Sequence, residues 1–217
     1  MHKLIGMVAT TVDIFNNLWS VFSTLGVIVG IVVISYMVYL IVRNRARGGA
    51  PEPEDSPKPG ELPRERKGAK KLLLSVFLSA SIVISLILLT FIALDNLDRP
   101  PADAMEVKVV AFQWGWKFYY PNGYEAVGEL RIPRGTAVKF YVTSQDVFHN
   151  MGIIDLRFKI DAIPGKTNIG WTRVYQAGVY EIRCFELCGD GHGVMIGRLI
   201  AMEPEEFNSW YSSLQAS

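Results

Sequence analysis

The stretch Cys-Phe-Glu-Leu-Cys-Gly-Asp-Gly-His-Gly-Val-Met, residues 184–195, gathers metal-ligand chemistry into one short segment. It contains both cysteines of the chain and one of its three histidines, and it ends on a methionine. Residues 178–184 alternate as in a strand that ends at Cys184. Glycine at 189, 191 and 193 then favours a tight loop that turns His192 and Met195 back toward the sulfurs. We therefore expect the whole stretch to close on one point.

The types of ligand in this stretch select copper. Thiolate and thioether sulfurs suit copper, and a Met near a Cys and His set is the usual weak axial ligand of electron-transfer copper. A single blue-copper ion needs one Cys, whereas the two cysteines here can bridge a pair of coppers, which then needs a second imidazole. His149, which follows the alternating segment 136–143, is the candidate, because His2 lies beside the initiator Met.

Two other interpretations of the cysteines remain open at this point. Two cysteines in an exported domain are more often a disulfide, and a Cys-x-x-x-Cys pair can be half of a zinc site. A zinc tetrahedron would have to use the same residues, because the chain has no other Cys and only His2 besides. The joint spacing of five residues favours copper over both alternatives: His149, Cys184, Cys188, His192 and Met195.

The chain resembles subunit II of cytochrome c oxidase, a family with a dinuclear copper centre called CuA. The family pattern is Cys-x-Glu-x-Cys-Gly-x-x-His-x-x-Met after an earlier Asp-Val-x-His, and every fixed position is present here. The resemblance also includes Gln-Trp-Gly-Trp at 113–116 and Asp-Ala-Ile-Pro-Gly at 161–165. It covers nearly the whole chain.

The resemblance implies a complete ligand set. Cys184 and Cys188 would bridge the two coppers. One copper would be completed by His149 and Met195, and the other by His192 and the backbone carbonyl of Glu186. The Glu186 carboxylate would help to bind Mg²⁺ at the interface with a partner subunit, since Mg²⁺ prefers hard oxygen ligands.

The run 112–116 predicts where electrons enter the protein. We expect the indoles of Trp114 and Trp116 on the same face of a strand-like segment. The resemblance implies that Trp114 is the residue through which electrons from the donor enter. The commoner fate of a Trp in a β-sandwich is burial in the core, which we expect more for Trp116. Gly115 stands where the family often has an aromatic residue.

The resemblance implies an enzyme subunit, the electron-accepting subunit of a terminal heme-copper oxidase. It would take electrons from a cytochrome c, or from a small blue-copper protein as second choice. It would pass them to the heme of subunit I for reduction of O₂ to water coupled to proton pumping, with other membrane subunits as further partners. A CuA-containing nitric oxide reductase subunit and a membrane-anchored copper carrier are the alternatives. A nitrous oxide reductase is disfavoured because it typically has Trp at the position of Glu186 and a large propeller.

Two charge-free segments, 18–42 and 72–94, predict a membrane hairpin. At ~1.5 Å per residue either can cross ~30 Å of hydrocarbon. A cleaved signal peptide is disfavoured for the first, because arginines at 43, 45 and 47 follow it at once. The connecting segment 43–71 is Pro-rich and carries nine Lys or Arg, whereas residues 1–17 carry only Lys3. The loop is therefore expected on the inner side, extended and mobile.

This topology predicts a two-helix, multi-pass protein with its copper domain on the outer face. We expect the cell membrane of a bacterium or archaeon, with the mitochondrial inner membrane as the alternative. The expected domains are the hairpin at 1–102 and the copper domain at 103–217. Residues 103–217 carry 11 Lys or Arg against 13 Asp or Glu, a net of about −2, so the domain has no nucleic-acid footprint.

Residues 103–217 predict an all-β domain, which the resemblance makes a cupredoxin-like Greek-key sandwich or barrel. Short strand-like runs alternate with Pro and Gly. The expected strands are 107–112, 117–120, 129–132, 136–143, 168–175, 179–184 and 195–202. A short amphipathic helix from Pro204 is expected to pack on the barrel or on a partner.

Overall fold

A computed structural model describes residues 11–45, 60 and 69–214 of the chain. The described residues form two units. One holds the apolar helices between Leu18 and Ile92, and the other joins the residues up to Asn17 to those from Ala93 onward. Most of the expected inner loop, 43–71, falls on 46–59 and 61–68, which lie outside the described residues, as does His2.

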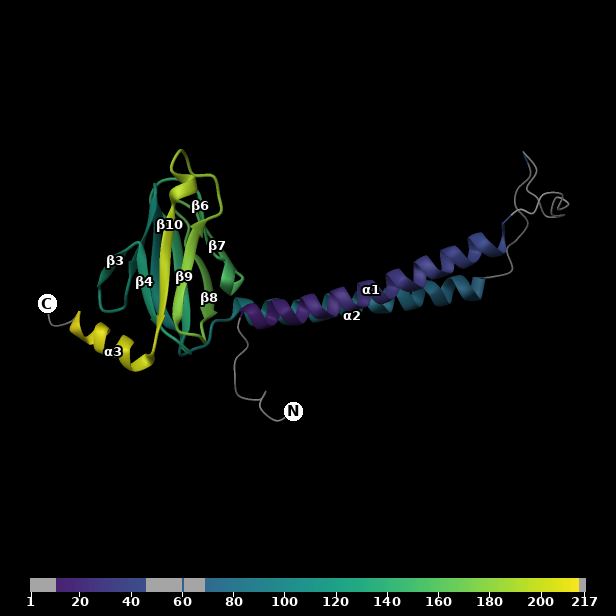
Figure 1. Ribbon diagram of the computed structural model, residues 1–217, viewed down its shortest axis with the longest axis horizontal. Helices are drawn as coiled ribbons and strands as arrows, with labels where there is room; N and C mark the ends of the chain where they lie inside the picture. Colours follow the sequence, from purple (N-terminus) through teal and green to yellow (C-terminus); the bar gives the residue numbers. More distant parts are fainter. Residues whose placement is uncertain (1–10, 46–59, 61–68, 215–217) are drawn as a thin grey trace. The chain divides into compact units, whose positions relative to one another are not determined.

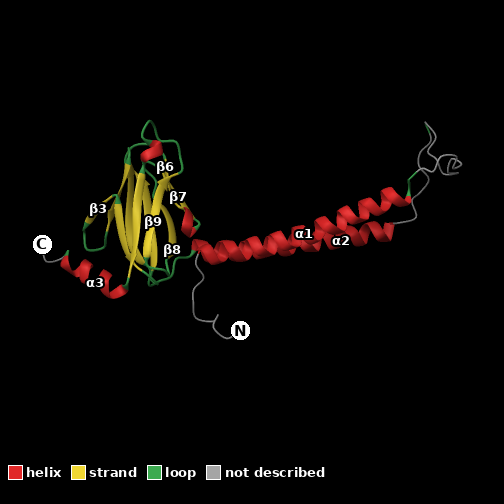
Figure 2. Ribbon diagram, in the orientation of Figure 1, coloured by secondary structure: helices red, strands yellow, loops and turns green. Residues whose placement is uncertain are grey.

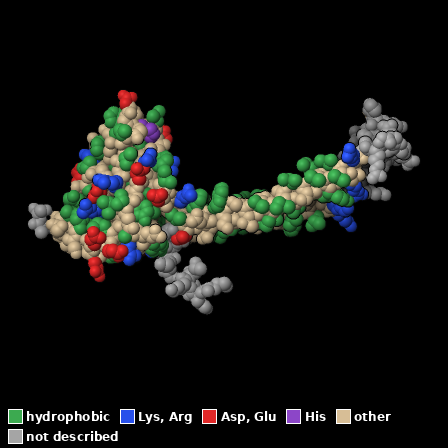
Figure 3. Space-filling model, in the orientation of Figure 1, with side chains coloured by type: hydrophobic (Ala, Val, Ile, Leu, Met, Phe, Trp, Pro, Cys, Tyr) green, Lys and Arg blue, Asp and Glu red, His purple; other side chains and the backbone are tan. Residues whose placement is uncertain are grey.

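The two apolar segments form long helices, α1 (Thr11–Arg43) and α2 (Ala69–Asp98). Both extend beyond the charge-free cores from which they were expected. The most apolar window has a mean hydropathy of 2.7 in α1 and 2.8 in α2. No side chain of either window is buried by the described part of the chain. Hydrophobic side chains line both helices, and Lys and Arg gather at one end (Figure 3). Helices of this length and composition can cross a membrane.

Within the described part of the chain, ten strands form two five-stranded sheets, ordered β3-β2-β1-β5-β8 and β4-β10-β9-β6-β7 (Figures 1 and 2). Most neighbouring strands are antiparallel, but β1 pairs with β5 and β4 with β10 in parallel. The strands are β1 (Met105–Phe112), β2 (Gly115–Tyr119), β3 (Glu125–Val127), β4 (Glu129–Pro133), β5 (Ala137–Ser144), β6 (His149–Ile153), β7 (Phe158–Ala162), β8 (Asn168–Arg173), β9 (Gly178–Cys184) and β10 (Ile196–Met202).

Period-two alternation puts one face of each sheet into a shared core. Along β1 the side chains of Val107, Val109 and Ala111 are fully buried, while Glu106 and Lys108 face solvent. Apolar burial of this kind is the main source of stability for such a sandwich. The predicted fold class, a two-helix hairpin followed by an all-β sandwich, is confirmed.

Strands β3, β6 and β7 were not predicted, and one of them changes the description of the metal site. We expected His149 in a loop after a strand, but it is the first residue of β6. The sequence of β6, His-Asn-Met-Gly-Ile, has polar residues and a glycine that hide its strand character. Its pairing with β7 and β9 holds it in the sheet.

The C-terminal helix α3 (Pro204–Ser213) packs on the sandwich, as expected. Pro204 occupies its first turn, where a missing N–H costs nothing. Phe207 is buried, and the ring of Trp210 lies 5.6 Å from that of Tyr120. In Figure 1 the loop between β9 and β10 projects from the end of the sandwich opposite α3. The cysteine-bearing loop and α3 therefore lie at opposite ends of the sandwich.

Candidate metal centre

The two cysteines lie together at the end of the sandwich. Cys184 is the last residue of β9, and Cys188 lies in the loop that follows. Both are free and buried, and their Sγ atoms are 3.7 Å apart. A disulfide would need about 2.05 Å. The pair is thus a dithiol whose sulfurs can both reach the same ion.

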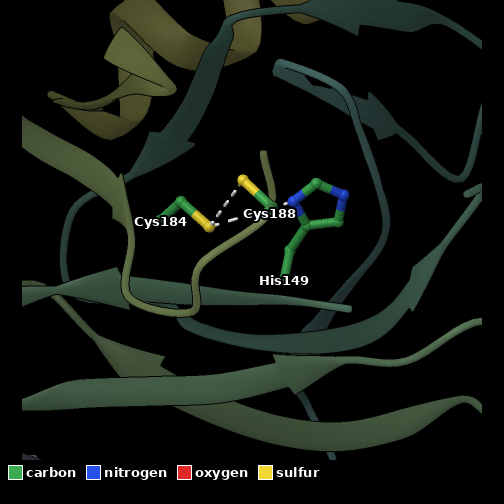
Figure 4. A group of neighbouring side chains, drawn as sticks. All are labelled: His149, Cys184 and Cys188. Carbon is green, nitrogen blue, oxygen red and sulfur yellow. Dashed lines mark hydrogen bonds between the residues drawn. The ribbon is translucent and has the colours of Figure 1, made fainter. Parts of the chain in front are cut away.

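His149 reaches the cysteines because its strand is paired with theirs. Met151 of β6 is opposite Cys184 of β9 in the ladder, so the start of β6 meets the end of β9. The His149 side chain is fully buried, and its Nδ1 atom is 3.8 Å from Cys184 Sγ. Ligand atoms of His149, Cys184 and Cys188 all lie within 4.8 Å of one another (Figure 4). At this separation all three side chains can bind at one metal site.

The loop after Cys188 brings the remaining expected ligands to the sulfurs. A turn of 3-10 helix, His192–Val194, is closed by the N–H of Met195 on the carbonyl of His192 at 3.3 Å. His192 Nδ1 and Met195 Sδ then lie 3.6 and 3.7 Å from Cys188 Sγ. The carbonyl oxygen of Glu186 is 3.2 Å from Cys184 Sγ. The other four expected positions therefore surround the two cysteine sulfurs.

Asp146 orients the buried imidazole of His149. Its Oδ1 atom lies 2.9 Å from His149 Nε2, so Nε2–H donates to the carboxylate and Nδ1 faces the sulfurs. Burial opposes ionisation of Asp146 most strongly, but hydrogen bonds from His149 and from the N–H groups of Gln113 and Val147 outweigh it and hold its pKa below the usual value. An ionised carboxylate at this position favours the Nδ1 ligand form of the imidazole.

The turn between β1 and β2 supports the cysteine loop. Gln113 Nε2 and Trp114 Nε1 both donate to the carbonyl of Cys188, at 2.8 and 3.2 Å. The Trp114 ring lies flat on Gly191, where a Cβ would come within 2.4 Å of Trp114 Cδ2. A side chain at 191 would have to displace the indole, which explains the glycine there.

The prediction that Trp114 and Trp116 share a face is wrong. Trp114 lies in the turn and is 43% exposed, whereas Trp116 belongs to β2 and is fully buried. The Trp116 ring lies edge-on to His149, with centroids 6.4 Å apart. The turn interrupts the alternation on which the expected shared face depended, so one indole packs in the core and the other lies at the surface.

Burial keeps the Cys188 thiol protonated without a metal. Burial, followed by the hydrogen bond and charge of Cys184, raises the pKa of Cys188 to about 11. Metal binding at this site must therefore displace a thiol proton near neutral pH. The donor set of two thiols, two imidazoles, a thioether and a carbonyl contains soft sulfur and more donors than one tetrahedral zinc ion uses. These residues fit copper.

Two supporting residues were missed by reasoning from the sequence, although both stand in motifs that were noticed. Asp146 is the first residue of Asp-Val-x-His, and Gln113 is the first of Gln-Trp-Gly-Trp. Their role depends on contacts between the turn and two distant loops. The spacing of a motif along the chain does not reveal such contacts.

The fold and the site define a class: a membrane-anchored, cupredoxin-like domain with a Cys and His cluster suited to copper. Residues 124–201 match the family model described as cytochrome C oxidase subunit II, periplasmic domain. The chain is 37% identical to the heme-copper oxidase subunit 2 of Aeropyrum pernix over 218 residues, which cover 95% of this chain and 92% of that protein. The chain belongs to the subunit II family of heme-copper, or cytochrome c, oxidases.

Two further comparisons agree with this family. The probable cytochrome c oxidase subunit 2 of Rickettsia prowazekii is 33% identical over 174 residues, which span 68% of this chain and 55% of that longer protein. The crystal structure of the periplasmic domain of subunit II of the Bradyrhizobium japonicum cytochrome oxidase matches with a TM-score of 0.51 at 28% identity. That match covers 53% of this chain and 96% of the other. The chain is thus a subunit of an oxidase complex that also contains subunit I.

Proposed function

We propose that this chain is the electron-accepting subunit of its oxidase. In this proposal it receives electrons from a soluble donor at a dinuclear copper centre and delivers them to the heme of subunit I, where O₂ is reduced to water and protons are pumped. The observation that carries the proposal is the pair of thiols 3.7 Å apart, each with a histidine Nδ1 atom within 3.8 Å. A single-copper site needs only one cysteine, so the second thiol favours a pair of ions.

The proposed ligand roles are those that the resemblance to the subunit II family implies. Cys184 and Cys188 would bridge the ions, His149 and Met195 would complete one, and His192 and the Glu186 carbonyl would complete the other. A copper pair held in this way supplies a one-electron store whose charge is spread over several heavy atoms. The chain contributes a buried site fixed to β6 and β9, which limits rearrangement when the charge changes. The Met195 thioether would be the weaker ligand and would tune the potential.

The exposed indole of Trp114 is the proposed point where electrons enter. Its Nε1–H donates to the Cys188 carbonyl at 3.2 Å, so this one side chain spans from the surface to a ligand residue. The donor is a cytochrome c as first choice and a small blue-copper protein as second. We place the domain on the outer face of a bacterial or archaeal cell membrane, because the basic segment 43–71 favours the inner side.

We further propose that the Glu186 side chain contributes to a Mg²⁺ site shared with subunit I. Its carbonyl lies at Cys184, and a carboxylate is the hard ligand that Mg²⁺ prefers while keeping several waters. This single residue would then connect the copper centre to the subunit interface.

A membrane-anchored copper carrier is the less favoured function. A carrier exchanges its ion, which calls for accessible ligands, whereas Met195, His149 and both cysteines are buried. Stopped-flow reduction of the assembled oxidase by reduced cytochrome c tests the proposed function. Copper absorption should change before heme absorption, and removing copper should abolish rapid heme reduction. Heme reduction at the same rate without copper would contradict the proposal.

A further inference from the structure

Gln113 lies between the two ligand-bearing segments and makes contact with both. Its backbone N–H donates to Asp146 Oδ2 at 2.7 Å, and the other oxygen of the same carboxylate meets His149 Nε2 at 2.9 Å. The main chain of Gln113 is therefore connected to the His149 ring through one carboxylate.

The side chain of Gln113 extends the connection to the cysteine loop. Its Nε2 donates to the Cys188 carbonyl at 2.8 Å, beside the longer bond from Trp114. The amide also lies against Gly189, where a Cβ would come within 3.0 Å of Gln113 Nε2. Gly189 has φ +111°, a conformation that other residues rarely adopt. The Gln113 amide is thus in contact with the backbone where the loop turns at Gly189.

We propose that Gln113 is a positioning residue for the metal centre, which holds the Cys188 peptide and the Asp146–His149 pair in one fixed arrangement. Gln113 is not one of the proposed ligands of the ions. It acts through its hydrogen bond to the Cys188 carbonyl, because the orientation of that peptide fixes the direction of the Cys188 side chain. The dipole of the Gln113 side-chain N–H also adds positive potential beside the Cys188 thiolate. The proposal rests on the copper centre proposed above.

The alternative role of Gln113 is donor binding, because its side chain lies at the surface beside Trp114. The two roles differ in what they change. A positioning residue affects the loop and the potential of the centre without any donor present. A binding residue affects only the interaction with the donor.

The test uses Gln113→Leu, which removes the donor group, and Gln113→Glu, which keeps the shape but replaces the donor with a carboxylate oxygen. Gln145→Leu is the matched control, since Gln145 is exposed on the neighbouring segment. In the metal-free full chain, hydrogen exchange of the amides of His192, Val194 and Met195 should rise about tenfold in both Gln113 variants, because a supporting hydrogen bond is lost. In the control it should stay within about twofold of wild type, as expected for a surface change.

The second measurement is the reduction potential of the copper-loaded full chain, determined with mediators and no donor. It should fall in Gln113→Leu and fall further in Gln113→Glu, because each change makes the surroundings of the thiolate more negative. Unchanged exchange and potential in both variants would overturn the proposal, as would equal shifts in Gln145→Leu or an effect confined to the KM for the donor. If the wild-type chain takes up no copper, the proposed function fails, while the exchange of the metal-free chain still decides whether Gln113 positions the loop.

Discussion

Asp146 Oδ1 lies 2.9 Å from His149 Nε2, and the opposite nitrogen of the same ring lies 3.8 Å from the Cys184 sulfur. The carboxylate is partly accessible, while the imidazole has no exposed surface. The orientation of a fully buried ligand is therefore controlled by a group at the rim of the site. A carboxylate behind a ligating histidine is a common way to fix its tautomer.

Asp146→Asn should weaken copper retention about 10–100-fold while the chain stays folded. The amide can donate to Nε2, which favours the tautomer with its proton on Nδ1, the wrong nitrogen for the metal. Competition with a copper chelator measures the change. Asp190→Asn, which removes a charge from an exposed residue of the cysteine loop, is the control. Equal copper affinity for Asp146→Asn and the wild type would show that Asp146 does not orient His149.

The two indoles of the Gln-Trp-Gly-Trp motif should respond differently to replacement by Phe. Trp114→Phe should keep the fold and the copper spectrum but slow electron transfer from the donor, because Trp114 is the exposed connection to Cys188. Trp116→Phe should destabilise the domain by about 2 kcal/mol through the cavity it leaves. Thermal unfolding and stopped-flow kinetics separate the two effects. Wild-type transfer in Trp114→Phe with slow transfer in a stable Trp116→Phe would reverse the assignment.

The ligand residues could be predicted from the sequence because their spacing is local. Five of the six positions lie in 184–195, where one strand end and three glycines bring them together. His149 could be selected as a residue, but its place at the start of β6 could not, because Asn150 and Gly152 disfavour a strand and five residues are too few to establish a period.

Contacts between distant segments were beyond prediction from the sequence. The separation of Trp114 from Trp116 depends on a turn that breaks the strand after Phe112. The connection from Gln113 to Asp146 and Cys188 joins residues 33 and 75 positions apart. No periodicity in the sequence encodes these pairs, since the first depends on the pairing of β1 with β5 and the second on how the two sheets meet.

Tyr120 should make stability sensitive to high pH. Its hydroxyl donates to the Arg131 carbonyl at 2.9 Å and accepts the Arg131 N–H at 2.8 Å, and burial raises its pKa above the ordinary value. The folded protein therefore favours the neutral phenol. This stabilisation is complete below about pH 10, the pKa of an unfolded Tyr, and is lost as the pH rises toward the folded pKa.

Tyr120→Phe should lower the free energy of unfolding by about 1–3 kcal/mol at pH 7, because the Arg131 groups lose their partner. The difference from wild type should stay constant below about pH 10 and shrink above it. Thermal unfolding of the full chain between neutral and high pH measures both. A difference that stays constant above pH 10 would show that this phenol does not contribute.

Glu186→Gln should separate the two proposed roles of this residue. The backbone carbonyl is unchanged, so the copper spectrum should remain that of the wild type. The weaker amide ligand should lower the affinity of the assembled oxidase for Mn²⁺, a paramagnetic substitute for Mg²⁺. Magnetic resonance of bound Mn²⁺ is the measurement, with Glu181→Gln on the exposed face of β9 as control. Unchanged Mn²⁺ binding would exclude the side chain from the site.

The paired thiols make a direct prediction about the number of metal ions. Copper-loaded full chain should contain two coppers, and its electron paramagnetic resonance spectrum should show hyperfine coupling to two equivalent copper nuclei. Cys184→Ser and Cys188→Ser should each lose this shared signal entirely instead of halving it, because both sulfurs bridge. One copper for each wild-type chain with coupling to a single nucleus, or preferential uptake of zinc under reducing conditions, would contradict the account.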